Sequence, residues 1–313
     1  MYSLKLIFGL AACGVMLAAA VSGQTLPNTL QTGKVLFVDD DGAQCPGALT
    51  TIQEAVAKAS PGTTILVCPG TYFKMVTISG SAKEAIRLIS LGQQDEVVLV
   101  GDHTEAYGFY LLDVKNVLIR GFTIRDFGDK PTTPSQAGNG CAIHVQNSNY
   151  NTIENNRLSR TDMMGITLWN SGNNTVRYNF IFEIDPKGFG NGIYLEGKKS
   201  ANNFIFQNYA YSQPGGGVLV WGAGTGNVIV DNDFSNLGWA GISNQDTDGT
   251  HIEGNRFSYN SVGIQLSTSN QAIVLDNMVR GNTKFDVSWD GKGDVSFSNN
   301  ACETANRAGL CGR

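Results

Sequence analysis

Short runs of alternating apolar and polar residues recur along the chain, and each run ends in an asparagine. These asparagines follow one another at steps of 23, 29, 24, 23, 22 and 22 residues. A period of this length indicates a repeat architecture, in which each coil packs on its neighbours. The residues are Asn156, Asn179, Asn208, Asn232, Asn255, Asn277 and Asn299.

Each coil divides into three short strands. In the coil from Asn151 to Asn173, the β-prone runs 151–156, 157–160 and 166–169 are separated by polar corners. Three strands of four or five residues in a 22–24-residue coil predict an all-β fold, a parallel β-helix with three sheets. The residues expected to point inward and stack in columns are Ile153, Val176, Tyr178, Ile205, Ile229, Ile252 and Val274.

The recurring asparagine suits a tight corner between two strands. Asparagine tolerates left-handed backbone angles, and its amide can hydrogen-bond the equivalent residue on the next coil, roughly 4.8 Å away. We therefore expect a structural ladder of asparagines, without a catalytic role.

Residues 1–23 predict a secretory signal peptide. A single lysine, Lys5, precedes an apolar run that ends in small residues, which is the usual pattern of a cleaved export signal. An uncleaved membrane anchor and a lipoprotein signal at Cys13 are the alternatives. We expect a secreted or periplasmic protein, a monomer with no membrane contact beyond this segment.

The rest of the chain is expected to form one domain after a polar linker, residues 24–34. Within 35–313 we assign an N-terminal cap (35–70), repeats (about 95–300) and a C-terminal disulfide loop (301–313). Thr51-Ile-Gln-Glu54 has the form of a capping box. It predicts a short helix through Ala59 that covers the open edge of the first coil.

Export permits disulfides, and the cysteine spacing suggests two. Cys45 and Cys68 lie 23 residues apart, one coil, and Cys302 and Cys311 lie nine apart at the C-terminus. Both pairs would staple an end of the solenoid. Cys141 is left over and is interpreted as a buried apolar thiol.

Composition narrows the class of partner. Charged residues make up 16% of the chain, the net charge is −5 and there are 38 glycines. These values suit a turn-rich β solenoid. Without a basic stripe, nucleic acid is excluded as an expected partner.

The opening DDDG, TIQEAV and ILVCPGTY segments, and the NxI-x-x-N…GI repeats, resemble right-handed parallel β-helix proteins of the pectin-lyase-like superfamily. Periplasmic copper-accessory-type and other secreted β-helix proteins have a similar entry. The resemblance covers about residues 35–300 and implies the fold. Because this superfamily includes lyases, hydrolases, epimerases, tailspikes and adhesins, it implies no single activity. Enzyme signatures are missing, and Asp185-Pro186-Lys187-Gly188 keeps only the first two residues of the DPHD epimerase motif.

The third strand of each coil presents two outward columns, because side chains alternate across a strand. In the second column, Trp169, Glu196 and Trp221 occupy consecutive coils. The first column contains His144, Thr167, Tyr194, Leu219, Ser243, Gln265 and Asp286. The second contains Gln146, Trp169, Glu196, Trp221, Gln245, Ser267 and Ser288.

Outward tryptophans on a solvated sheet suggest a platform for sugars, whose apolar ring faces stack on indole. Gln146 and Gln245 would pair with hydroxyl groups. Insertions at 126–139 and 183–190 would form a groove wall. Alternatively, these loops bury Trp169 and Trp221 in a hydrophobic cluster.

Two reaction types fit residues of this face. A lyase or epimerase would use Tyr194, His144 or Lys187 as base, with Lys187 or Arg160 stabilising the developing enolate. A hydrolase would need two carboxylates, Glu196 with Asp185 or Asp162. For Glu196 and His144, a solvated surface role is the plain alternative.

Acidic clusters are the only hint of a cofactor. Ca²⁺ is a weak candidate for Asp246, Asp248, His251 and Glu253, and for residues 39–41, although solvated turn carboxylates explain both clusters. We hypothesise an exported carbohydrate-active protein that binds an acidic polysaccharide and cleaves or epimerises it. A non-catalytic glycan-binding module and a structural scaffold are the alternatives.

Overall fold

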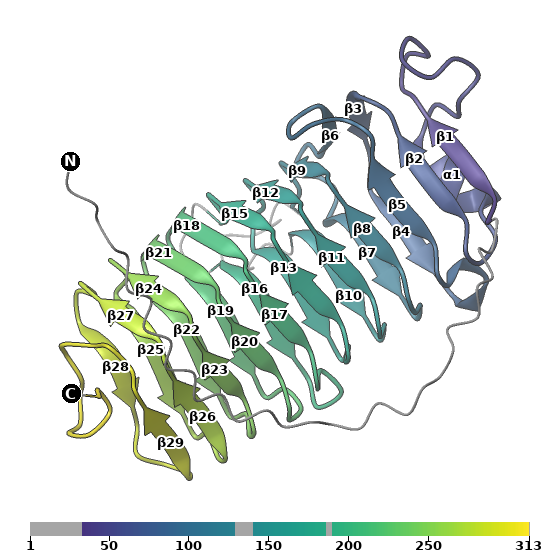
Figure 1. Cartoon of the computed structure of the whole chain (residues 1–313). Helices are drawn as coiled ribbons and strands as arrows, with labels where there is room; N and C mark the ends of the chain where they lie inside the picture. Colours follow the sequence, from purple (N-terminus) through teal and green to yellow (C-terminus); the bar gives the residue numbers. More distant parts are fainter. Residues whose placement is uncertain (1–32, 129–139, 186–189, 313) are drawn as a thin grey trace, which may run out of the picture. The chain divides into compact units, whose positions relative to one another are not determined.

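The computed structural model describes residues 33–128, 140–185 and 190–312. In this part of the chain, three parallel sheets wind into a solenoid (Figure 1). Sheets A, B and C, named by their strands below, contain 11, 9 and 9 strands. The expected three-sheet β-helix is confirmed.

The strands of each sheet follow one another at intervals of one coil. Sheet A contains β1 (Val35–Val38), β2 (Thr64–Val67), β5 (Arg87–Ser90), β8 (Leu118–Arg120), β11 (Thr152–Glu154), β14 (Thr175–Arg177), β17 (Phe204–Phe206), β20 (Val228–Val230), β23 (His251–Glu253), β26 (Ala272–Leu275) and β29 (Val295–Ser298). Sheet B contains β3 (Gly70–Phe73), β6 (Val97–Val100), β9 (Thr123–Arg125), β12 (Arg157–Ser159), β15 (Phe180–Phe182), β18 (Tyr209–Gln213), β21 (Asp233–Leu237), β24 (Arg256–Ser258) and β27 (Met278–Arg280). Sheet C contains β4 (Val76–Ser79), β7 (Tyr107–Leu112), β10 (Cys141–Gln146), β13 (Met164–Trp169), β16 (Asn191–Glu196), β19 (Gly216–Trp221), β22 (Ala240–Gln245), β25 (Val262–Ser267) and β28 (Phe285–Trp289).

Stacked aliphatic side chains fill the interior. In sheet C, Ile143 pairs with Ile166, which pairs with Ile193, and all three are fully buried. The expected inward column of sheet A is equally buried, with one exception. Tyr178 follows β14 at φ 57° and is 44% exposed. The strand ends at Arg177, so the left-handed bend turns Tyr178 outward, and its inward assignment was wrong.

The asparagine ladder lies between sheets A and B, and its hydrogen bonds are as expected. Asn179, for example, donates from both its backbone N and its Nδ2 to Oδ1 of Asn208, at 3.1 and 3.0 Å. Every ladder side chain is buried. The rungs are Asn156, Asn179, Asn208, Asn232, Asn255, Asn277 and Asn300.

Two details of the ladder differ from the sequence interpretation. The last rung is Asn300, because the exposed Asn299 occupies the corner position before it at φ 52°. The left-handed angle therefore belongs to the residue that precedes each rung, and the ladder asparagines do not adopt it. The preceding residues are Asn155, Tyr178, Gln207, Asp231, Gly254, Asp276 and Asn299.

A second ladder lies at the other end of the sheet A strands. Nδ2 of Asn151 donates to Oδ1 of Asn174 at 3.0 Å, and Asn174 and Asn203 continue the series to Asn227. The strands between the two ladders are three residues long. Buried amides therefore fix the register of β11, β14, β17 and β20 at both ends of each strand.

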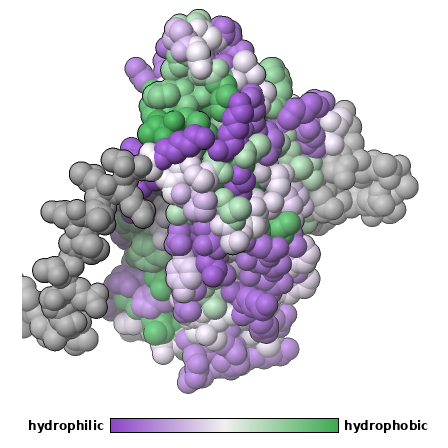
Figure 2. Space-filling model, turned by 90° about the vertical axis from the view of Figure 1, so that its right-hand side faces the viewer, coloured by the Kyte–Doolittle hydropathy of each residue, from purple (hydrophilic) through white to green (hydrophobic). Residues whose placement is uncertain are grey.

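The N-terminal end is covered as predicted. Helix α1 (Ile52–Lys58) begins after Thr51, whose Oγ1 accepts a hydrogen bond from Glu54 N at 3.1 Å. The helix packs against β1, β2 and β4, and Cys45 is bonded to Cys68. Figure 2 views the side on which β1 and α1 lie in Figure 1, and shows an apolar area in its upper part.

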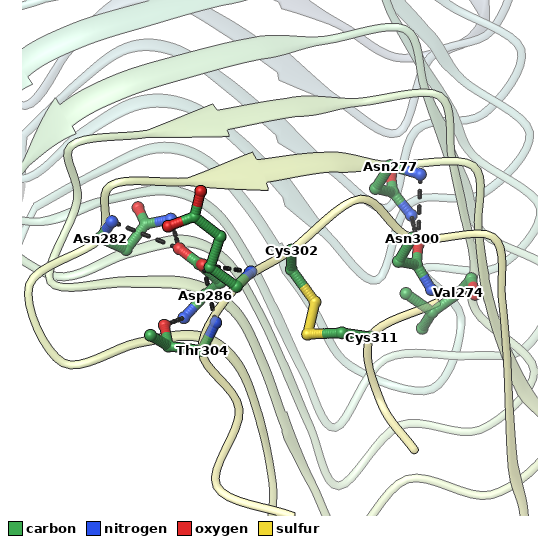
Figure 3. Close-up of a disulfide and its surroundings, with 9 residues drawn as sticks. Val274, Asn277, Asn282, Asp286, Asn300, Cys302, Thr304 and Cys311 are labelled. Atoms are coloured by element: carbon green, nitrogen blue, oxygen red, sulfur yellow. Dashed lines mark hydrogen bonds between the residues drawn. A yellow bond between two sulfur atoms is a disulfide. The ribbon is translucent and has the colours of Figure 1, made fainter. Parts of the chain in front are cut away.

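The C-terminal end closes with the second disulfide, Cys302–Cys311 (Figure 3). Beside it, the carboxylate of Asp286 accepts hydrogen bonds from Asn282 Nδ2 and from the backbone N–H groups of Glu303 and Thr304. Burial tends to raise the pKa of Asp286, but these donors outweigh it and lower the pKa. The terminal loop is thereby fixed to the last coil.

Asp286 also marks a register error in the sequence alignment. Gln265 pairs with Ser288, whereas the outward columns placed Asp286 beside Gln265. Asp286 and Ser288 therefore each lie two residues earlier along β28 than the positions that the columns gave them. A shift of two residues keeps the alternation of sides. The alternating pattern alone therefore could not detect the error.

Candidate functional site

The outer face of sheet C brings together the residues that the repeat placed there. Trp169 pairs with Glu196, and Glu196 pairs with Trp221. Gln146 and Gln245 extend this column by one coil on either side. One carboxylate therefore lies between two indoles on adjacent strands.

Both tryptophans are accessible. Trp169 is 41% exposed and Trp221 is 47% exposed. The alternative in which the neighbouring loops bury both indoles is therefore wrong. Exposed indoles in register on a rigid sheet are available to stack on a ligand.

Two adjoining pockets lie on this face. The first, the His144 pocket, has a volume of about 290 Å³, and the second, the Trp239 pocket, about 580 Å³. Met163, Met164 and Tyr194 line both. The His144 pocket is otherwise lined by Tyr107, Gly140, Cys141, His144, Thr167, Trp169 and Glu196. The Trp239 pocket is otherwise lined by Asn191, Pro214, Gly215, Leu219, Trp221, Gly238 and Trp239.

His144 lies in the first pocket with one nitrogen unsatisfied. Its ring stacks on Tyr107 at 4.5 Å between centroids and meets the edge of Trp169 at 6.1 Å. Only 6% of the residue is exposed, and its Nε2 has no hydrogen-bond partner among the described residues. Burial lowers the pKa of His144 to about 4, so the imidazole is neutral at pH 7.

Cys141 is a buried free thiol, as its odd count suggested. Its Sγ lies 3.2 Å from Thr167 Oγ1 and 3.9 Å from Nδ1 of His144. No partner for this thiol was evident in the sequence, although His144 follows it by three residues. Burial raises the pKa of Cys141 to about 12. Thiol and imidazole are both neutral, which differs from the ion pair of a catalytic cysteine.

Tyr194 is hydrogen-bonded to Glu196, two residues further along β16. Burial, followed by the negative charge of Glu196 and this hydrogen bond, raises the pKa of Tyr194. The phenol therefore stays protonated. This favours Tyr194 as a hydrogen-bond donor over its expected use as a base.

The other expected site residues are placed less centrally. Gln146 Oε1 accepts a hydrogen bond from Tyr110, and Gln245 Nε2 donates to Ser243, both at 2.8 Å. Asp185 is buried in the bend after β15, and the described linings of the two pockets do not include it. Lys187 lies outside the described residues.

The two remaining candidates for chemistry are engaged in contacts with other side chains. Asp162, the alternative hydrolase carboxylate, lies 2.9 Å from Nδ1 of His103. Arg160, the alternative cation, binds both carboxylate oxygens of Asp126. Asp126 holds the Arg160 guanidinium by hydrogen bonding and raises its pKa.

Sequence reasoning missed Trp239 and Tyr107. Trp239 lies in the bend before β22, and Tyr107 is the first residue of β7. Both precede the part of the third strand in which the outward columns were aligned. The available signal was an aromatic residue one or two positions before the Gly-Phe or Gly-Ile pair of a coil.

Several side chains of the acidic clusters are engaged in hydrogen bonds within the protein. Asp39 accepts from the backbone N of Gln44, and Asp40 from that of Thr71. Nε2 of His251 lies 2.6 Å from Oε2 of Glu253. The carboxylates of residues 39–41 lie within 4.8 Å of one another, but Asp39 binds within its own turn and Asp40 binds the backbone of a residue 31 positions away.

The geometry described above is that of a parallel β-helix with a solvent-exposed groove on one sheet. The family model "Right handed beta helix region" matches residues 65–234, more than half of the chain. The chain belongs to this family, which also confirms the expected handedness. A search of curated proteins gives no match.

Solved structures share the fold at low sequence identity. XylC in complex with xylose has a TM-score of 0.65 at 13% identity, over 84% of this chain and 70% of that chain. An alginate lyase from Paenibacillus sp. str. FPU-7 has a TM-score of 0.58 at 17% identity, over 83% of this chain and 94% of that chain. Pectate lyase Pel9A has a TM-score of 0.57 at 16% identity, over 91% of this chain and 82% of that chain. PfbA, a surface adhesin of Streptococcus pneumoniae, has a TM-score of 0.55 at 16% identity, over 80% of this chain and 75% of that chain.

Among the helices of the described ranges, none has the length and apolar character needed to span a bilayer.

Proposed function

We propose that this protein is an exported glycan-binding β-helix whose ligand lies along the outer face of sheet C. The observation that carries the proposal is the pair of exposed indoles, Trp169 and Trp221, on either side of Glu196. Indole faces stack on the apolar faces of sugar rings, and carboxylates accept hydrogen bonds from sugar hydroxyls.

The spacing of the indoles suits a chain of sugars. Trp169 and Trp221 lie on strands two apart in sheet C, about 10 Å from one another along the solenoid at the usual strand spacing. The two indoles would therefore contact different units of one ligand that lies parallel to the solenoid axis. A polysaccharide ligand is also supported by the likeness in fold to an alginate lyase and a pectate lyase.

Export is part of the proposal. The signal-like segment 1–23 and the two disulfides support a secreted or periplasmic location. Cell fractionation followed by mass spectrometry of the mature N-terminus tests it. A cytoplasmic protein that retains residues 1–23 would contradict it.

Binding is tested with a panel that includes alginate, pectate and neutral polysaccharides, by calorimetry on the mature protein. Trp169→Ala and Trp221→Ala are each expected to weaken binding tenfold or more, about 1.4 kcal/mol. Tyr259→Ala is the matched control, because Tyr259 is 71% exposed and lies beyond β24 of sheet B. Equal affinities of all four proteins would sink the proposal.

Catalysis on the same ligand is a second candidate, favoured by the neutral imidazole of His144. A base that removes the proton next to a uronic carboxylate must be unprotonated and within reach of the substrate. His144 meets the first condition, and its Nε2 has no hydrogen-bond partner among the described residues, but this atom is buried and the pocket would have to open slightly for a substrate to reach it. Tyr194 would then hydrogen-bond the leaving oxygen, which takes its proton from water, and Lys187 remains the proposed cation. The ultraviolet absorbance of an unsaturated product, present in the wild type and lost in His144→Gln, tests a lyase activity.

A further inference from the structure

The two pockets on sheet C differ in the hydrogen bonds that they offer. The lining of the His144 pocket includes three polar side chains, those of His144, Thr167 and Glu196, although Nε2 of His144 is itself buried. Each of these can pair with a sugar hydroxyl. This pocket therefore suits a sugar ring that stacks on Trp169.

The Trp239 pocket offers few such partners. Its lining is formed largely by two indoles, two methionines, Leu219 and Pro214. Asn191, one of its polar residues, already accepts a hydrogen bond from Gly216 N at 3.2 Å and has further interactions. A sugar ring in this pocket would leave hydroxyls unpaired, at a cost of about 1–3 kcal/mol for each buried group.

The lack of charged side chains in the lining of the Trp239 pocket also favours an apolar ligand group. Tyr194 is its one described lining side chain that can ionise, and it stays protonated for the reasons given above. A charged group would therefore lose water without gaining an opposite charge among these residues. An uncharged apolar group would instead gain roughly 25 cal/mol for each Å² that it buries.

The pockets adjoin, so one molecule can occupy both. Met163, Met164 and Tyr194 line both of them. We infer that the ligand is a sugar that carries an uncharged apolar substituent, with the sugar in the His144 pocket and the substituent between Trp221 and Trp239. This inference rests on the proposed glycan-binding function and specifies the class of glycan.

Paired glycosides test the inference. The probes are the para-nitrophenyl and methyl glycosides of xylose, glucose and galactose, with free para-nitrophenol as a third arm. We expect the aryl glycoside of at least one sugar to bind tenfold or more tightly than its methyl glycoside. The Trp239→Ala variant is expected to lose this advantage. In the Trp169→Ala variant, the affinities for both glycosides are expected to fall, and the ratio of the two affinities is expected to stay the same.

Leu219→Asn is a second variant that adds a polar group to the Trp239 pocket at a partly exposed position. It is expected to reduce the aryl advantage as well, and Tyr259→Ala again serves as control. Melting temperatures show that each variant is folded.

The other outcomes separate this inference from the proposed function. Equal affinities of aryl and methyl glycosides would overturn the inference and leave glycan binding intact. Binding of para-nitrophenol as tight as that of its glycosides, with no effect of Trp169→Ala, would overturn both. An aryl advantage that Trp239→Ala and Leu219→Asn leave unchanged would place the substituent elsewhere and also overturn the inference.

Discussion

Sγ of Cys141 lies 3.9 Å from Nδ1 of His144, and burial keeps both groups uncharged at neutral pH. Most pairs of this kind that do chemistry are charged, with a thiolate beside an imidazolium. Here the pair forms part of the floor of a pocket, and its reactive form is disfavoured. Two predictions depend on this state.

Stability should fall in mild acid because of His144. Its pKa is about 4 in the folded protein against an ordinary 6.5. Between these values the unfolded state binds the proton and the folded state does not. This contribution is present above pH 6.5 and is lost as the pH falls to 4, to the extent of about 3 kcal/mol. Denaturant unfolding of the wild type and of His144→Gln at pH 7 and pH 4.5 measures it, and parallel losses would contradict the assignment.

Cys141 should resist alkylation in the folded protein. Its pKa of about 12 leaves almost no thiolate at pH 7.5, and the thiolate is the reacting species. Iodoacetamide is expected to label Cys141 at least a hundredfold more slowly in buffer than in denaturant, as followed by mass spectrometry. Fast labelling without denaturant would mean that this pocket opens readily.

The last rung of the asparagine ladder can be identified by mutation. Oδ1 of Asn300 accepts hydrogen bonds from both N and Nδ2 of Asn277, whereas the exposed Asn299 takes a left-handed angle. We expect Asn300→Ala to lower the free energy of unfolding by about 1–3 kcal/mol. The matched change Asn299→Gly should be within about 0.5 kcal/mol of the wild type, since glycine accepts this angle. The reverse order of the two effects would restore Asn299 as the rung.

The terminal disulfide should stabilise the last coil. Cys302 and Cys311 close a loop with a sequence separation of nine, for which loop-closure entropy predicts about 2–3 kcal/mol. The double change to serine is expected to lower the midpoint of denaturation, with Cys141→Ser as the single-thiol control. An unchanged midpoint would show that the Asp286 hydrogen bonds suffice to hold the terminal loop.

The fold and the register of the central coils could be predicted because they depend on the repeat itself. Once the Gly-Ile pairs at 165–166 and 192–193 are aligned, Trp169 and Glu196 are aligned too, and the structure pairs them. Local interactions within one coil set this relationship, so sequence spacing carries it.

Other features could not be predicted, for physical reasons. The alternation of sides is unchanged by a shift of two residues, which concealed the position of Asp286. The pocket wall formed by Trp239 depends on a bend whose path is not repeated from coil to coil. The uncharged state of His144 results from burial by Tyr107 and Trp169, which come from different coils.

The two asparagine ladders have a consequence for the length of the molecule. Each ladder residue bonds to its counterparts on adjoining coils and to nearby backbone carbonyls that recur in each coil. Duplication of one coil, such as that from Asn151 to Asn173, would therefore keep both series of amides intact. Such an insertion would lengthen the groove of sheet C by about 4.8 Å, one strand spacing. The number of sugar units that a protein of this design accommodates could thus be changed in whole steps, without redesign of its interior.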